Sequence, residues 1–170
     1  RTLARTGRRE VARSGRDLST GERELTIDSL AAGGEGVGRD TAGRVVFVPF
    51  AAPGDRLRVR VVEEHERFAR AEIEAIAAPG AARVDPPCAV FGDCGGCAWQ
   101  HVAYPAQLDA KRAILADALA RIGGIEAGAI EMVASPQPYA YRSRARLLAQ
   151  GGLVGFRRRR SHEPCPIARC

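Results

Sequence analysis

The sequence has almost no lysine, a single methionine and no long hydrophobic run. Only Lys111 among its 26 basic residues is lysine, so arginine carries the positive charge. Guanidinium groups suit phosphates and stack on bases, although the codon bias of a GC-rich genome also enriches arginine. No stretch approaches the roughly 18 consecutive apolar residues of a membrane-spanning helix, so we expect no membrane association. The only methionine is Met132, and from this we expect a piece of a longer protein.

Size and composition are those of a folded protein. The chain has 170 residues and a mass of 18.2 kDa, which allows one ordinary domain or two small ones. Hydrophobic residues make up 45% and charged residues 27%, which argues against wholesale disorder. The net charge of +6 and the isoelectric point near 9.5 are consistent with a polyanionic partner.

Residues 1–21 are polar and rich in arginine, and we expect a basic flexible arm there. Glu10 and Asp17 interrupt the positive charge, and no amphipathic stripe is present, which argues against a transit peptide. No secretory hydrophobic region follows. We therefore expect the protein in the cytoplasm, as a monomer.

Residues 22–80 are β-like, with short apolar runs separated by Gly, Asp and Pro. Several short strands without a helical period indicate a small barrel of the OB type. Along Arg56, Arg58 and Arg60 the alternation with apolar residues is strict, so the arginines line one strand face. The glycine cluster at 33–38 lacks the dinucleotide-binding pattern and is interpreted as a flexible turn. The expected strands are Glu24–Leu30, Arg44–Phe50, Arg56–Glu63 and Arg70–Ile76.

Residues 81–170 predict a small α+β domain after a proline-rich linker. A cysteine-rich loop precedes a helix at Pro105–Ile122, in which Leu108, Leu115, Leu119 and Ile122 share a face. Two strands follow, at Arg142–Leu148 and Leu153–Arg158, joined by a glycine turn. The predicted fold class is therefore mostly β with one helix, an OB-like barrel followed by the α+β domain.

Cysteine is the strongest chemical signal in the chain. Cys88, Cys94 and Cys97 have the spacing C-x5-C-x2-C, while Cys165 and Cys170 lie far downstream. Five cysteines in a chain expected in the cytoplasm indicate metal or redox chemistry rather than disulfides. Three clustered thiolates and one distant thiolate favour an iron–sulfur cluster, with zinc and unliganded thiols as alternatives.

The residues around the cysteines closely resemble the uracil-5 RNA methyltransferases that carry a TRAM domain and a [4Fe-4S] cluster. Residues 94–101 read CGGCAWQH and are followed by YPAQL at 104–108 and by Lys111. The resemblance extends over about residues 22–170. Its further parts are LAAGGEGVG at 30–38, VVFVP at 45–49, PGD at 53–55, PYAYRSRAR at 138–146 and GFRR at 155–158 with Ser161-His162.

The resemblance implies a cluster held by Cys88, Cys94, Cys97 and a fourth cysteine. Counting from Ser161-His162 without gaps gives Cys170, whereas Cys165, which is followed by proline, is the alternative. It also implies a TRAM barrel at 22–80 and a partial central iron–sulfur domain at 81–170. The nucleophile, the base and the S-adenosylmethionine site of such enzymes belong to a Rossmann-like domain that nothing here matches, so this segment alone is not expected to catalyse methyl transfer.

We expect RNA as the partner, 23S rRNA rather than tRNA, with arginines supplying phosphate contacts. The alternative is a stand-alone RNA-binding module with a structural metal site and no catalysis. Trp99 is expected to pack in a core, and His101 to bond the cysteine loop rather than to ligate metal. The candidate RNA-binding residues are Arg56, Arg58, Arg60, Arg142, Arg144, Arg146, Arg157 and Arg158.

Overall fold

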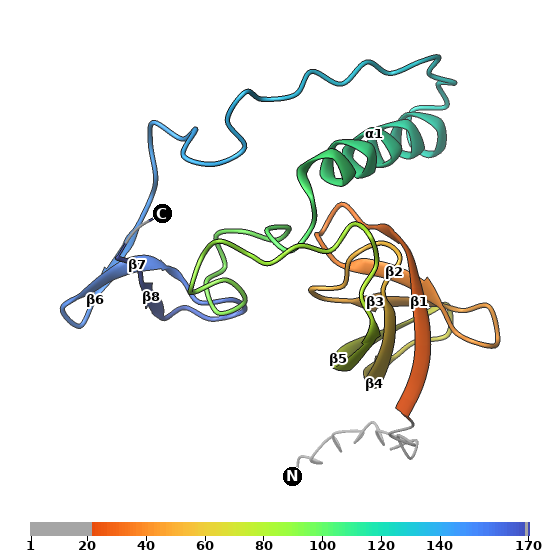
Figure 1. Ribbon diagram of the computed structural model, residues 1–170, viewed down its shortest axis with the longest axis horizontal. Helices are drawn as coiled ribbons and strands as arrows, with labels where there is room; N and C mark the ends of the chain where they lie inside the picture. The colour runs from red at the N-terminus through yellow and green to blue at the C-terminus, as the bar shows by residue number, and fades with distance from the viewer. Residues whose placement is uncertain (1–21, 169) are drawn as a thin grey trace, which may run out of the picture.

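The computed structural model describes residues 22–168 and 170, so the basic arm expected at 1–21 lies outside the described residues. Five strands form a closed barrel, one helix lies beside it, and a three-stranded sheet stands apart (Figure 1). This confirms the predicted class, mostly β with one helix. The elements are β1 Glu22–Leu30, β2 Gly36–Arg39, β3 Val45–Val48, β4 Arg56–Glu64, β5 Phe68–Ala78, α1 Tyr104–Arg121, β6 Leu148–Gln150, β7 Leu153–Arg157 and β8 Pro164–Pro166.

The barrel closes in the strand order β1-β2-β3-β5-β4, with β4 pairing back to β1. Only the β3–β5 pair is parallel; the other pairs are antiparallel. Strand β4 shows why the sequence pattern predicted it well. Leu57, Val59 and Val61 are buried in the barrel core, while the residues that alternate with them are exposed.

The prediction of a flexible turn at residues 33–38 was wrong for residues 36–38. Gly36 and Gly38 belong to strand β2, which pairs with β1 and β3, rather than to a flexible turn. A Cβ on Gly38 would stand 2.5 Å from the carbonyl oxygen of Thr26, so glycine lets two backbones approach closely. Composition suggested flexibility, but strand pairing required the absence of side chains.

A buried carboxylate joins the barrel to the segment that follows it. Asp55 is completely buried, and its oxygens accept hydrogen bonds from the backbone amides of Ala52 (2.7 Å) and Gly80 (2.9 Å). The Arg83 guanidinium donates to the same carboxylate at 2.5 Å and to the carbonyl of Phe50 at 2.8 Å. Burial alone would raise the pKa of Asp55, but these hydrogen bonds outweigh it and lower the pKa.

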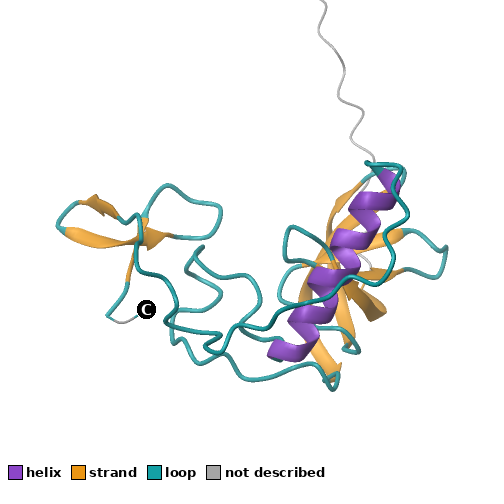
Figure 2. Cartoon of the chain, turned by 90° about the horizontal axis from the view of Figure 1, so that it is seen from above, coloured by secondary structure: helices purple, strands orange, loops and turns teal. Residues whose placement is uncertain are grey.

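Helix α1 agrees with the prediction in extent but not in packing. Its Ala106 and Ala110 pack against a small cluster formed by Leu30, Ala52 and Val102 at the barrel's end, and Figure 2 shows the helix crossing beside the barrel. The face predicted to be apolar is not a core face, because no α1 residue is buried within residues 22–168 and 170. The side chain of Leu115, for example, is 45% exposed. No helix in the described part of the chain is long and apolar enough to cross a membrane.

The C-terminal sheet is smaller than predicted at one end and larger at the other. The turn between β6 and β7 is formed by Gly151 and Gly152, both at positive φ, as the glycine pair suggested. The strand predicted from Arg142 is wrong over residues 142–147, which form no strand, so their arginines do not share a strand face. Strand β8, which pairs with β7, was missed because prolines at both of its ends hide it.

We predict that Asp55→Asn lowers the free energy of unfolding by about 3 kcal/mol, because Arg83 is left without its buried partner. Since the folded-state pKa of Asp55 is lowered, this stabilisation is present above the unfolded-state pKa and is lost as the pH falls through the folded-state pKa. Urea unfolding at several pH values measures both effects. Asp28→Asn, at an exposed position on the same barrel, is the control; an equal effect of both variants would contradict the prediction.

Candidate functional site

Two turns shape the cysteine loop at residues 88–97. The backbone amide of Phe91 donates to the carbonyl of Cys88 at 3.0 Å, and the amide of Cys94 donates to the carbonyl of Val90 at 2.9 Å. The Gly96 amide then donates to the Cys94 sulfur at 3.4 Å. The two backbone hydrogen bonds fold the chain between Cys88 and Cys94 into a compact loop.

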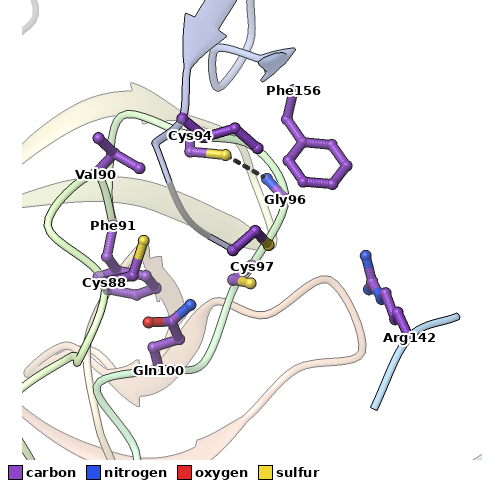
Figure 3. Close-up of a pocket in the computed structure, with 11 residues that line it drawn as sticks. Cys88, Val90, Phe91, Cys94, Gly96, Cys97, Gln100, Arg142 and Phe156 are labelled. Atoms are coloured by element: carbon purple, nitrogen blue, oxygen red, sulfur yellow. Dashed lines mark hydrogen bonds between the residues drawn. The ribbon is translucent and has the colours of Figure 1, made fainter. Parts of the chain in front are cut away.

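The four predicted cluster ligands line one cavity. Figure 3 shows Cys88, Cys94 and Cys97 around it, and Cys170 also belongs to its lining. The remaining walls are mainly apolar side chains, together with two polar ones, Gln100 and Arg142. The apolar lining residues are Val90, Phe91, Phe156 and Ile167. The fold thus brings together three cysteines of one loop and a fourth that is 73 positions or more away in sequence.

Cys165 has a different environment from the other cysteines. It lies on β8, is 1% exposed and is not part of the cavity lining. Its sulfur is 3.6 Å from a carboxylate oxygen of Asp93. Burial, reinforced by the negative charge of Asp93, raises the pKa of the Cys165 thiol, which favours the protonated form.

The cysteines surround a space rather than a point. No group of three or more His, Cys, Asp or Glu side chains among the described residues is gathered tightly enough to hold one metal ion. A zinc ion draws its four ligands to within about 2.3 Å of itself. A four-iron cluster instead binds each thiolate to a separate iron, so its ligands stand farther apart. The donor set, four thiols in a largely apolar cavity, fits a thiolate-bound cluster.

The cysteine loop is fastened to the end of β7 and the segment after it. The Gly95 amide donates to the carbonyl of Arg157 at 2.9 Å, and the Arg159 amide donates to the carbonyl of Asp93 at 2.8 Å. Cys94 and Arg158 form an isolated antiparallel bridge. The Arg158 guanidinium forms an ion pair with the Asp93 carboxylate. The sequence analysis did not single out Asp93; its position next to Cys94 was the only signal available.

A groove beside the cysteine loop is lined by arginines. Its walls combine residues 95–98, residues 146–148 and residues 156–162, with Gly33 from the barrel. All four arginines of the run 157–160 contribute, together with Arg146. Burial, with repulsion from Arg160, lowers the pKa of Arg159, which also stacks over the Phe50 ring at 4.4 Å. The groove therefore concentrates positive charge next to the cavity.

The predicted arginines do not form one surface. Arg146, Arg157 and Arg158 line the groove, whereas Arg142 lines the cysteine cavity and is exposed. Arg144 is exposed on the segment that forms no strand.

The arginines of β4 lie on the outer face of the barrel. Arg56, Arg58 and Arg60 are all exposed. Arg60 forms ion pairs with Glu72 at 2.7 Å and Glu74 at 3.5 Å, so this face carries both signs of charge. Its positive potential is therefore weaker than a count of arginines suggests.

His101 and Trp99 connect the cysteine segment to the barrel. The Nε2 atom of buried His101 lies 3.2 Å from the carbonyl of Ala51, a barrel-side partner rather than the cysteine loop that was expected. Burial lowers the pKa of His101, which favours a neutral ring. Trp99 packs against the small hydrophobic cluster at the barrel's end, consistent with its predicted packing role.

We predict that Gly155→Ala disrupts the C-terminal sheet, because the added Cβ would collide with the carbonyl of Cys165 on β8. We expect a loss of at least about 2 kcal/mol in the free energy of unfolding of this sheet. Hydrogen exchange of the β7 and β8 amides measures it. The matched control is Gly128→Ala, whose Cβ would meet nothing within 4 Å; equal protection in both variants would refute the prediction.

Comparison with known proteins shows what the chain resembles. Residues 21–73 match the family model of the TRAM domain. An uncharacterized RNA methyltransferase, tlr0942 of Thermosynechococcus vestitus, is 42% identical over 152 residues, 86% of this chain and 34% of the relative. The 23S rRNA (uracil(1939)-C(5))-methyltransferase RlmD of Halomonas elongata is 42% identical over 159 residues, 88% of this chain and 33% of the relative.

A solved structure agrees with these relatives. The tRNA (uracil-54, C5)-methyltransferase of Pyrococcus abyssi, in complex with S-adenosyl-L-homocysteine, has a TM-score of 0.55 and 28% identity. The match covers 86% of this chain and 32% of that one. The chain thus spans about a third of the length of the curated relatives it matches. Residues 21–73 thus match the TRAM domain, and 86–88% of the chain is similar to about a third of the length of RNA methyltransferases.

Proposed function

We propose that this chain is the RNA-recognition and iron–sulfur portion of an S-adenosylmethionine-dependent RNA uracil-C5 methyltransferase acting on 23S rRNA. The observation that carries the proposal is the convergence of Cys88, Cys94, Cys97 and Cys170 on one cavity, directly beside a groove lined with arginines. The relative named as a 23S rRNA methyltransferase supports the choice of RNA. The tRNA enzyme with a similar fold makes tRNA the second candidate substrate.

The proposal divides the described part of the chain into two domains. Residues 22–80 form the TRAM barrel, and residues 81–170 form a central domain that holds the cluster. We place the methyl donor and the catalytic residues outside these 170 residues, so this segment binds and orients RNA. Its thiolates must stay reduced, which the reducing cytoplasm provides.

The cluster would be held by the thiolates of Cys88, Cys94, Cys97 and Cys170. Thiolate-bound irons would supply a cross-link between the cysteine loop and the segment after β8, with no electron transfer in the methylation itself. The Gly96 amide, which points at the Cys94 sulfur, is suited to stabilising a thiolate that binds iron. The apolar side chains of Val90 and Phe156 would limit the access of water.

RNA would lie along the groove formed by the cysteine loop and the arginines after β7. The run 157–160 and Arg146 offer guanidinium groups to successive phosphates. The facing acids are few: Asp93 pairs with Arg158, and Glu35 lies 3.6 Å from Arg160. The barrel face with Arg56, Arg58 and Arg60 would be a second, separate contact with RNA.

The ligand proposal predicts that Cys94→Ser and Cys170→Ser each lose most iron and sulfide, because each removes one thiolate of the set. Metal and sulfide analysis of protein purified without oxygen measures the loss. About four irons and four sulfides per chain are expected before mutation, with broad absorption near 400 nm. Cys165→Ser, which changes a cysteine outside the cavity and leaves a hydroxyl that can still donate to Asp93, should keep its iron. One zinc and no sulfide in the unchanged protein would favour the zinc-stabilised RNA-binding module instead.

The groove proposal predicts that replacing Arg157 and Arg160 with Ala weakens binding to a 23S rRNA fragment and flattens its salt dependence. Each lost phosphate contact should reduce the slope of log K against log salt by about 0.7 to 0.9. Fluorescence anisotropy at several salt concentrations measures the slope. Replacing Arg112 and Arg121, exposed arginines of α1, is the matched control.

The same titration tests the barrel face and the choice of RNA. Replacing Arg56, Arg58 and Arg60 with Ala should also flatten the slope of log K against log salt. An unchanged slope would exclude that barrel face from the RNA-binding surface. Tighter binding of tRNA than of the 23S fragment would move the substrate to tRNA.

A further inference from the structure

We propose that Asp93 is a positioning residue that holds the segment carrying Cys170 against the cysteine loop. The inference depends on the proposed cluster, since it concerns how the fourth ligand reaches the other three. Cys88, Cys94 and Cys97 lie on one loop, and turns within it shape the stretch from Cys88 to Cys94. Cys170 follows β8, so its position depends on how the C-terminal sheet is joined to that loop.

The carboxylate of Asp93 contacts two elements of that sheet at once. Its Oδ2 atom accepts from the Arg158 guanidinium, just after β7, and from the Cys165 thiol on β8 at 3.6 Å. The backbone bonds of Gly95 and Asp93 reach only the chain at the end of β7. The side chain of Asp93 thus adds a direct contact to β8, which leads to Cys170.

This contact should matter more for the ligand than for the fold. The side chains of Asp93 and Arg158 are 50% and 39% exposed, and exposed ion pairs contribute little to global stability. Ligand placement is more sensitive, because residues that orient a ligand change metal retention about 10- to 100-fold when they are removed. Removing the carboxylate should therefore make the placement of the Cys170 thiolate less firm, while the barrel stays folded.

An iron whose protein ligand is poorly placed can be detected by its loss on oxidation. One-electron oxidation by ferricyanide converts [4Fe-4S]2+ to [4Fe-4S]3+ and yields ferrocyanide. The oxidised cluster releases one Fe2+ and leaves [3Fe-4S]+, so charge and atoms balance. The iron whose ligand is least firmly placed leaves most easily. The [3Fe-4S]+ form is paramagnetic, so electron paramagnetic resonance follows its appearance, whereas general unfolding would lose all the iron.

The test compares Asp93→Ala with Asp109→Ala, which removes an exposed carboxylate that forms an ion pair on α1. After anaerobic loading and ferricyanide addition, we expect the three-iron signal to appear about tenfold faster in Asp93→Ala than in the unchanged protein or the control. If Asp93→Ala does not load, the rate is measured on Asp93→Asn, which removes the charge and keeps the size. An unchanged rate in a loaded Asp93 variant would overturn the inference.

A double-variant cycle separates positioning from other effects. Arg158→Ala should accelerate the three-iron signal as well, and Asp93→Ala with Arg158→Ala should be no faster than the faster single variant. Additive effects would mean that the two residues act separately and would refute the shared contact. If the unchanged protein holds no iron or sulfide, the proposed function itself fails. If the cluster is present but its rate of iron loss does not change in the Asp93 variants, only the inference about Asp93 fails.

Discussion

The buried charge of Asp55 is the interaction on which the arrangement of this protein depends. A carboxylate removed from water must be compensated, and here two backbone amides and one guanidinium do so. The guanidinium belongs to Arg83, in the segment after the barrel, and also binds the carbonyl of Phe50. The direction in which the chain leaves the barrel towards the cysteines therefore follows from satisfying one charge.

The cysteine cavity depends on a second junction, between the loop at 88–97 and the end of β7. The loop carries three cysteines, and Cys170, from a separate segment, lines the same cavity. Backbone bonds from Gly95 and to Asp93 make this junction. The same junction forms one wall of the arginine groove. A change at the loop would thus reach both the proposed metal site and the proposed RNA surface.

The local sequence pattern was sufficient to predict a strand with one exposed and one buried face and a turn built from two glycines. Strand β4 followed from strict alternation, and the β6–β7 turn from its two glycines. Strand β2 was missed, because Gly36 and Gly38 carry no alternation and serve a close approach between strands. The strand predicted from Arg142 was wrong, because alternation shows only that a strand is possible, and no neighbouring strand pairs there among the described residues.

The sequence by itself indicated the chemistry: three cysteines with metal-like spacing and two more downstream, a positive charge carried by arginine and a barrel with alternating strands. Only the tertiary structure decided which cysteines line one cavity. Cys165 and Cys170 are both downstream cysteines, but pairing of β8 with β7 buries the first beside Asp93 and leaves the second at the cavity. The spacing of residues along the chain limits which side chains one loop can bring together. The pairing of distant strands decides on which face of a sheet a side chain lies.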